Sequence, residues 1–339
     1  AQEYEVMKAA HAMRVALPAP LWHCVDPAVL GQDFFVMDFL EGVAEPHKLF
    51  GHALDGQRET FIGQVGEQLA RLQAVVPGPG VLPFLDPPPH NVALETIAKL
   101  RACLDRHELP HPAIEFGLRW LERNAPPPAQ AVLCHGDFRS GNYMVKGGQL
   151  QGVLDWELGH WGDPHEDLGW FCQRFFRFGK VGKEAGGMAD REHLLRGYER
   201  AAGRHVAPEA MAYWDIMANV KWAVVSLQQA ARYTSGAVDT FELALVGLAT
   251  AEMEMEALDL IGAREDHVLH VRDHAARARS VAGERAVHDG EETAVDLLLD
   301  HQKVHQRFMD HRVRPVAALV QQAAKGVLHG ARGGREDVR

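Results

Sequence analysis

The sequence lacks the features that mark several protein classes. No apolar run approaches the ~18 residues that a membrane-spanning helix needs, and no signal-peptide pattern is present. Its four cysteines are widely separated and form no C-x-x-C pair, which is typical of reduced thiols in a cytoplasmic protein. The formal net charge of −11 argues against nucleic acid and anionic membranes as partners. We therefore expect a cytoplasmic protein with neither kind of partner.

Two common enzyme motifs are also absent. The 20 histidines are scattered and no H-E-x-x-H occurs, so the zinc-protease helix is not present. No G-x-x-x-x-G-K-[ST] phosphate loop occurs either, and Gly78-Pro79-Gly80 lacks the strand–turn–helix context that such a loop requires. Any nucleotide phosphates must therefore be held in another way.

The composition is that of an ordinary globular protein, with 47% apolar and 24% charged residues. The length of 339 residues predicts two domains or one large two-lobed domain. Apolar periodicity predicts a helix over 1–16, and strands over 21–25 and 33–40 on either side of a turn at Asp26-Pro27. Further predicted helices cover 58–75, 92–107, 112–124, 166–178, 191–202, 208–233 and 238–261. A His- and Arg-rich tail follows from 263, with helices over 267–285 and 292–328 and a disordered end over 330–339.

One polar loop and the hairpin after it carry the chemistry. An apolar strand begins at Val132 and leads into the loop His135–Asn142, and strands over 143–146 and 149–154 flank a Gly147-Gly148 turn. Counting back from this turn pairs Lys146 with Gln149 and Asn142 with Val153. Asp155 then lies two residues past Asn142's partner. Two carboxylates, Asp137 and Asp155, and one carboxamide, Asn142, are therefore expected at the open end of the hairpin.

The spacing His135-x-Asp137-x-x-x-x-Asn142, followed by Asp155, is typical of magnesium-dependent phosphoryl transfer. In that chemistry a carboxylate orients the acceptor hydroxyl and takes its proton, the role predicted for Asp137. Amide and carboxylate oxygens suit Mg²⁺, so Asn142 and Asp155 are the predicted metal ligands. His135 is expected to support the loop through hydrogen bonds, and Arg139 is a further candidate catalytic residue.

Three stretches carry a family resemblance: "LCHGDFRSGNYMV", "GVLDWELGHWGDPHEDLGW" and "FFVMDFLEG". Over residues 1–262 the chain resembles the aminoglycoside phosphotransferase and choline-kinase-like proteins. It looks most similar to a bacterial branch like the kinase-like domain fused to acyl-CoA dehydrogenases. The resemblance implies an α+β, protein-kinase-like two-lobed fold with a truncated N-lobe over 1–42, a mostly helical C-lobe over 43–262 and a helical tail over 263–339.

The resemblance also implies roles for individual residues. Asp137 matches the catalytic aspartate, Asn142 and Asp155 match the metal ligands, and Asp167 matches an aspartate that braces the catalytic loop. ATP and Mg²⁺ are the implied cofactors. The implied ATP contacts are the hinge residues Met37, Asp38, Phe39 and Leu40, whose backbone would meet adenine, and Glu3 or Glu5, which would pair with a phosphate-binding lysine.

The chain departs from this family pattern at its start. The family's small lobe has three strands before the helix, which carry the phosphate-covering loop and the lysine, whereas this sequence begins at the helix. Lys8 is expected on the same helix as Glu3 and Glu5 and so cannot replace that lysine. We expect the complete gene product to contain roughly 60 further N-terminal residues, about what three strands and their turns require.

Several alternatives remain open from the sequence. The acceptor can be an aminoglycoside-like sugar, an amino alcohol or a hydroxyacyl thioester. A pseudokinase or nucleotide-binding scaffold would explain the missing lysine, and a metal-dependent hydrolase could use the same carboxylates without a hinge. A transition-metal site at His160, Asp163, His165 and Asp167, a Cys134–His135 nucleophile pair and a stacking platform of Trp156, Trp161 and Trp170 are disfavoured in comparison with ordinary loop and core packing. The tail is a candidate surface for homo-oligomer formation.

Overall fold

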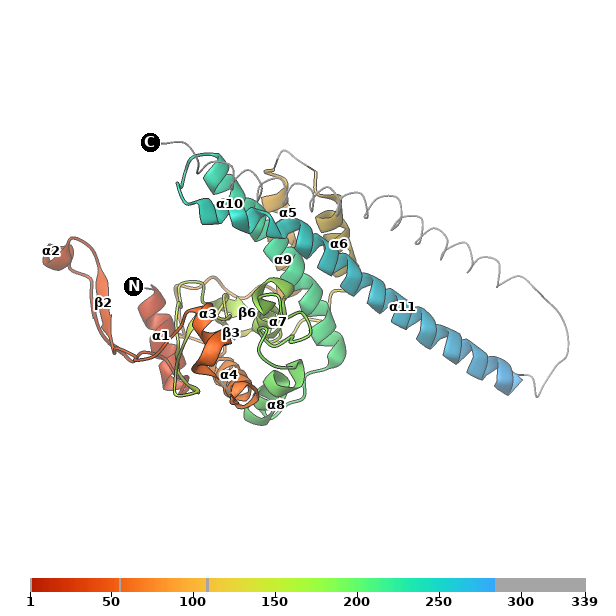
Figure 1. The fold of residues 1–339 in the computed structure, drawn as a ribbon, viewed down its shortest axis with the longest axis horizontal. Coiled ribbons are helices and arrows are strands. Elements are labelled where there is room, and N and C mark those ends of the chain that lie inside the picture. The colour runs from red at the N-terminus through yellow and green to blue at the C-terminus, as the bar shows by residue number, and fades with distance from the viewer. Residues whose placement is uncertain (1, 55, 108–109, 284–339) are drawn as a thin grey trace, which may run out of the picture. The chain divides into compact units, whose positions relative to one another are not determined.

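A computed structural model describes residues 2–54, 56–107 and 110–283 (Figure 1). The chain forms two compact units, Ala1–Leu269 and His270–Arg339. Helix α11 (Ala249–Gly283) crosses the boundary between them, and of the second unit only its helical backbone up to residue 283 is described. The predicted helix over 292–328 and the predicted disordered end lie outside the described residues.

The first unit begins with a helix packed on a small hairpin. The elements are α1 (Gln2–Ala12), β1 (Pro20–Cys24), α2 (Pro27–Leu30) and β2 (Phe34–Met37), and β1 pairs with β2 in antiparallel fashion. The ring of Tyr4 on α1 lies 5.1 Å from that of His23 and 5.8 Å from that of Phe35, which joins the helix to both strands. The strand β2 ends at Met37, three residues before the predicted strand end at residue 40.

The predicted turn at Asp26-Pro27 is the start of a short helix instead. The Asp26 side chain accepts a hydrogen bond from the amide of Ala28 at 2.9 Å, and Pro27 occupies the first helical position. Both features are standard helix-start signals, so this local error comes from treating Asp-Pro only as a turn.

The remaining elements are mostly helical. They are α3 (Pro46–Lys48), η1 (Leu49–Ala53), α4 (Arg58–Leu72), α5 (Val92–Leu104), α6 (Pro112–Arg123), β3 (Val132–Cys134), β4 (Tyr143–Lys146), β5 (Gln149–Val153), β6 (His160–Gly162), α7 (Glu166–Cys172), η2 (Arg174–Arg177), α8 (Arg191–Ala202), α9 (Pro208–Thr234) and α10 (Phe241–Gly247), before α11. Within the described ranges the strands form three two-stranded sheets, β1-β2, β3-β6 and β4-β5. The predicted α+β class is confirmed.

A short segment connects the β1–β2 hairpin to the β4–β5 hairpin. Val43 and Val145 exchange two backbone hydrogen bonds, of 2.8 and 2.9 Å, so the chain after β2 is tied to β4. Gly42 adopts a φ of +144°, and a Cβ there would lie 2.4 Å from the carbonyl oxygen of Val145. Gly42 is therefore a position where two backbone segments approach too closely for a side chain.

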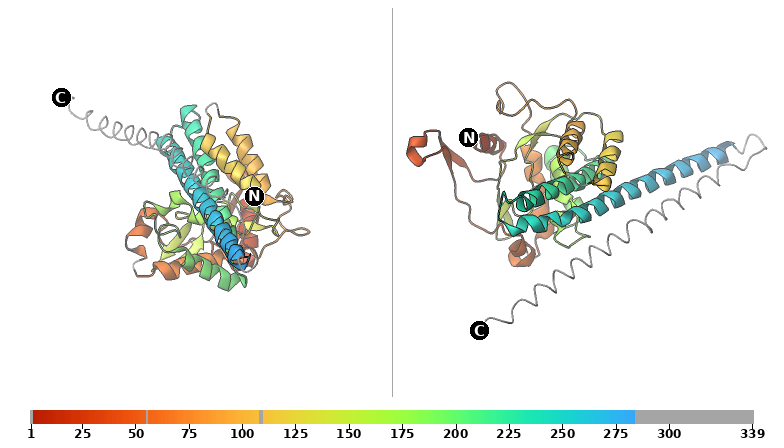
Figure 2. Two further views of the ribbon diagram at one scale, coloured as in Figure 1. Left: turned by 90° about the vertical axis from the view of Figure 1, so that its right-hand side faces the viewer. Right: turned by 90° about the horizontal axis from the view of Figure 1, so that it is seen from above.

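Two large apolar clusters and one small cluster support the elements in the described part of the chain. The first joins α1, α4, α8 and the strands around the loop His135–Asn142, and the second joins α5, α6, α9 and the first turns of α11. The small cluster consists of Trp170, Phe176 and Ala218. Helix α11 begins beside α9, with which it shares the second cluster, and its length is seen in Figure 2. Gly262 lies inside α11, so the predicted break between helices at 262 is wrong: the helix continues through a glycine because the preceding turns pack Met253, Ala257 and Ile261 into the core. Among the described residues, no helix is both long and apolar enough to cross a lipid bilayer.

Helices α4 and α8 touch through glycines. A Cβ on Gly197 of α8 would lie 2.0 Å from the carbonyl oxygen of Gly63, and one on Gly66 would lie 2.2 Å from that of Leu194. These distances are far below ordinary contact, so both positions require glycine for close approach of the two backbones.

We predict that Gly197→Ala lowers the free energy of unfolding by about 1–3 kcal/mol, because the two helices must separate. Gly63→Ala on the facing helix is the matched control. A Cβ there meets its nearest neighbour, the carbonyl oxygen of His193, at 3.8 Å, so it should be neutral or stabilise by up to ~1 kcal/mol. Urea unfolding of the two variants measures the difference, and equal effects would contradict the close-contact explanation.

Candidate active site

The loop His135–Asn142 is anchored at its start by a buried carboxylate. Asp167 on α7 accepts hydrogen bonds from the backbone amides of His135 and Gly136, at 2.7 and 3.0 Å. Burial, together with the neighbouring charge of Glu166, raises the pKa of Asp167 to about 6. The bracing role expected for Asp167 is confirmed.

Asp137 is held by donors from three side chains. Arg139 Nε lies 3.0 and 2.8 Å from its two carboxylate oxygens, and Asn142 Nδ2 donates to Oδ2 at 2.9 Å. The third donor is the indole Nε1 of Trp170, 2.9 Å from Oδ1. The Asp137 side chain is still 15% exposed. The carboxylate is therefore oriented by the protein and can still be reached from solution.

The hairpin register differs by one residue from the predicted one. The pairs Lys146–Gln149 and Val145–Leu150 follow the expected count, but Met144 then pairs with Gly152, which leaves Gln151 as an extra residue in β5. Tyr143 consequently faces Val153, and the prediction that Asn142 faces Val153 is wrong. A bulge of this kind inserts a residue without ending the ladder and is not marked by the two-residue turn.

This shift places Asp155 directly beside the loop backbone. The amide of Leu154 donates to the carbonyl oxygen of Asn142 at 2.8 Å, and the carbonyl oxygen of Leu154 lies 2.9 Å from His135 Nε2. Asp155 follows with a φ of +66°, in the left-handed region that aspartate tolerates better than most residues. Its side chain is exposed. The two hydrogen bonds to the backbone of Leu154, which we call the Leu154 clamp, thus fix the backbone position of Asp155.

His135 acts as a neutral hydrogen-bonding group. Its Nε2 donates to the carbonyl of Leu154, which leaves Nδ1 to accept from the amide of Asp137 at 3.3 Å. Complete burial lowers the pKa of His135 to about 4. A neutral imidazole can donate and accept at the same time, so the residue ties the loop to the hairpin, as predicted, and does not supply a charge.

The predicted nucleotide-contacting residues lie elsewhere in the first unit. Met37 ends β2, while Asp38, Phe39 and Leu40 follow it, and the side chain of Phe39 is 88% exposed. The Asp38 amide already donates to the carbonyl of Ala19 at 2.9 Å.

Glu3 is half-buried on α1. Lys8 lies on the same helix, as predicted, and its Nζ forms an ion pair with Glu5 at 3.0 Å. Within the described part of the chain, no hydrogen bond or ion pair links Asp137 with Glu3 or with the segment that follows β2.

The alternative transition-metal site is not formed. In the part of the chain that the structure describes, no group of three or more His, Cys, Asp or Glu side chains is arranged to hold a metal. His165 Nδ1 instead lies 2.8 Å from Asp163 Oδ1, and His160 Nε2 lies 3.3 Å from Glu166 Oε2. Loop bracing accounts for this cluster.

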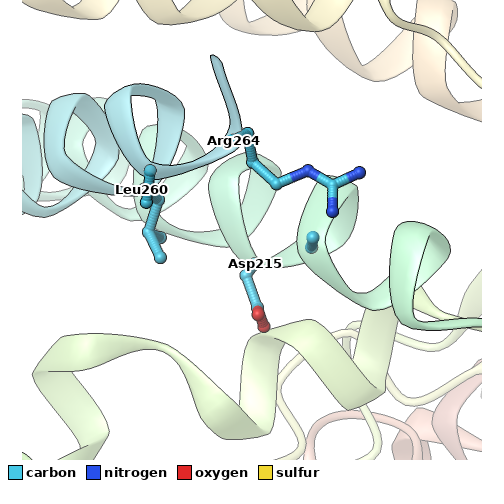
Figure 3. A pocket seen from close by; sticks show the side chains of 5 residues that line it. Asp215, Leu260 and Arg264 are labelled. Atoms are coloured by element: carbon cyan, nitrogen blue, oxygen red, sulfur yellow. The ribbon is translucent and has the colours of Figure 1, made fainter. Parts of the chain in front are cut away.

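A pocket between α9 and α11 is separate from the loop (Figure 3). Its lining is Ala212, Asp215, Leu260, Ala263 and Arg264. In Figure 3 the carboxylate of Asp215 points away from Arg264, and it binds Arg191 at 2.6 Å. Burial raises the pKa of Asp215 to about 6. None of the residues predicted from the sequence to act in catalysis lines this pocket.

Sequence reasoning missed Trp170, which it assigned only to packing. A signal was present: Trp170 comes three residues after Asp167 on α7, so both side chains lie on the same helix face. Because Asp167 binds the start of the catalytic loop, the residue one turn later is brought beside that loop as well.

We predict that His135→Gln weakens the decrease in free energy of unfolding as the pH falls below about 6.5. In the unfolded chain His135 takes up a proton near pH 6.5, but in the folded chain only near pH 4, so its contribution is present above pH 6.5 and is lost as the pH falls to about 4. Between pH 6.5 and pH 4 the difference in free energy of unfolding between wild type and the variant should fall by about 3 kcal/mol. Denaturant unfolding at a series of pH values measures it. The exposed His11→Gln is the control and should parallel wild type; a His135→Gln profile that also does so would refute the explanation.

Solved structures share this fold. A candidate aminoglycoside phosphotransferase from Ralstonia eutropha superposes with a TM-score of 0.65 at 22% identity, covering 76% of this chain and 82% of that one. A choline/ethanolamine kinase family protein from Mesorhizobium loti gives 0.50 at 20% identity, covering 77% and 78%. The chain therefore has the kinase-like fold of small-molecule phosphotransferases, which confirms the predicted fold class.

The sequence also matches a family model. Residues 1–214 match the model of the Phosphotransferase enzyme family, and the chain belongs to this family. Curated relatives include acyl-CoA dehydrogenase family member 10 of Mus musculus, 26% identical over 181 residues, and family member 11 of Pongo abelii, 24% identical over 253 residues. These matches cover 52% and 69% of this chain but only 17% and 32% of the relatives, so the chain corresponds to a minor part of each.

Proposed function

We propose that the protein transfers the γ-phosphoryl group of ATP to a hydroxyl group of a small molecule, with Mg²⁺ as the cofactor. The observation that carries this proposal is the Asp137 carboxylate, which three donors orient at the end of a braced loop and which remains partly exposed. Membership of the phosphotransferase family supports the reaction class. Phosphoryl transfer depends mostly on positioning and charge neutralisation, and a fixed carboxylate supplies the first.

Asp137 would orient the acceptor and receive its proton. The acceptor oxygen forms a bond to the γ-phosphorus, the bond from that phosphorus to the bridging oxygen breaks, and ADP leaves. The hydroxyl proton passes to the Asp137 carboxylate. Since Arg139, Asn142 and Trp170 already hold this group, little reorganisation is needed when the hydroxyl arrives.

Asn142 and Asp155 fit a magnesium site in their chemistry. The nitrogen of the Asn142 amide donates to the side chain and the backbone carbonyl of Asp137, both at 2.9 Å, so its oxygen is the atom oriented for a cation. Asp155 adds an exposed carboxylate. One amide and one carboxylate, completed by water and phosphate oxygens, are a usual set for Mg²⁺, which when bound neutralises phosphate charge.

Other residues complete the proposal. Arg139, 30% exposed, could exchange one contact with Asp137 for the transferred phosphoryl group. Met37, Asp38, Phe39 and Leu40 would meet adenine through the backbone, with the Asp38 amide excluded because it binds Ala19. Glu3 would face a phosphate-binding lysine.

The acceptor class is proposed from the relatives. Their names place similar sequence in acyl-CoA dehydrogenase proteins, so a hydroxyacyl thioester is the first acceptor to test. Aminoglycosides and amino alcohols, such as choline, form the rest of the panel because the solved structures with this fold carry those names.

We expect Asp137→Ala to reduce ATP turnover with the active acceptor by at least ~10²-fold, the usual contribution of a general base. Coupled ADP release over the acceptor panel measures turnover, and thermal unfolding checks that the variant folds. Asp239→Ala, an exposed loop carboxylate, is the control and should retain wild-type turnover. A folded Asp137→Ala variant at full activity would refute the assignment.

We further expect Asp155→Asn to raise the Mg²⁺ concentration for half-maximal turnover by about tenfold or more, since a charged ligand is lost. Glu157→Gln removes an exposed carboxylate two residues away and should leave the magnesium dependence unchanged. A magnesium titration at saturating ATP gives both values. If the two variants shift it equally, Asp155 is not a ligand.

A further inference from the structure

We propose that Trp170 is a positioning residue for Asp137, and that a partly buried cluster of ionisable side chains behind its ring keeps the indole N–H directed at the Asp137 carboxylate. The cluster consists of His160, Glu166 and Lys221. This inference rests on the proposed function, because it gives Trp170 a part in orienting the acceptor hydroxyl.

Trp170 differs from the other two donors in its origin. Arg139 and Asn142 belong to the same loop as Asp137, so they move with it. Trp170 lies on α7, 33 residues further along the chain, and only 5% of it is exposed. Its 2.9 Å hydrogen bond therefore relates the carboxylate to the helical core, and the two local donors cannot do this.

Packing leaves the indole little freedom. The centroid of its ring lies 5.6 Å from the ring centroid of Phe176 and 5.6 Å from that of Trp222, and both contacts are edge-to-face. Lys221 Nζ lies 4.8 Å from the ring centroid, in the range of a cation–π contact. A ring enclosed in this way by aromatic neighbours and an ammonium group holds its N–H in a single direction.

The Lys221 ammonium group is itself fixed. Its Nζ donates to Glu166 Oε1 at 3.0 Å, and the other oxygen of Glu166 lies 3.3 Å from His160 Nε2. Glu166 is 6% exposed and begins α7, while Lys221 lies on α9. The ion pair thus joins the two helices at the level of Trp170. Among the described residues, none of these three side chains forms a hydrogen bond with Asp137, so their effect on it passes through the ring.

The chain offers a matched control for the indole donor. Trp222 belongs to the same aromatic group, and its Nε1 is buried with no hydrogen-bond partner among the described residues. Trp170→Phe and Trp222→Phe both replace an indole by a phenyl ring in this group. Only the first removes a hydrogen bond to Asp137.

The test compares kcat and KM for ATP in the two variants, after thermal unfolding has shown that each is folded. Trp170→Phe should lower kcat by about tenfold or more, the value of a hydrogen bond to a charged group, with KM for ATP within about twofold of wild type. Trp222→Phe should change kcat by no more than about twofold. Equal kcat losses in the two variants would overturn the proposal, since packing alone would then explain them.

A second measurement needs no acceptor. In protein labelled with ¹⁵N-tryptophan, the indole N–H signal absent from Trp170→Phe identifies Trp170. In Asp137→Ala this signal should move upfield as its carboxylate acceptor is lost, while the Trp222 signal stays in place. If none of the tryptophan indole N–H signals moves in Asp137→Ala, the proposal is overturned, and this outcome requires neither the assignment nor a folded Trp170→Phe variant. Wild-type inactivity with every acceptor, together with a moved signal, would instead refute the proposed function and leave only the contact.

Discussion

The two hydrogen bonds that Asp167 accepts from the backbone of His135 and Gly136 are the constraint on which the site depends. A buried carboxylate is stable only where donors satisfy it, and two backbone amides leaving a strand would otherwise lack partners. Each side therefore satisfies the other. These two hydrogen bonds connect the end of β3 to α7 and fix the direction in which the chain enters the loop. Asp137 comes two residues later and has little room to vary.

The Leu154 clamp extends this constraint to the hairpin. His135 binds the carbonyl oxygen of Leu154 and the carbonyl of Asn142 binds its amide, so both halves of the motif converge on the backbone of one residue. The extra residue in β5 makes this possible, because the expected register would have placed Val153 there. A neutral His135 suits the position, since a protonated ring would have to remain charged in a fully buried setting.

Charged and aromatic groups outside the motif form a second layer. Glu166 and Lys221 join α7 to α9, and Trp170 lies between that ion pair and the Asp137 carboxylate. Replacing one partner of a buried pair leaves the other without compensation, so such pairs maintain geometry even where they add little stability.

Local features could be predicted from the sequence because they depend on neighbours in the chain. The glycine turn, the helix periodicity, the His135-to-Asn142 spacing and the bracing role of Asp167 follow from short-range patterns and family resemblance. Only the tertiary structure decided the rest. The bulge at Gln151 is determined by contacts across the hairpin, α11 continues through Gly262 because its preceding turns are buried, and Trp170 reaches Asp137 only when α7 packs against the loop. The bulge depends on how the two strands of one hairpin meet, whereas the other two outcomes depend on packing between residues that are distant in the sequence.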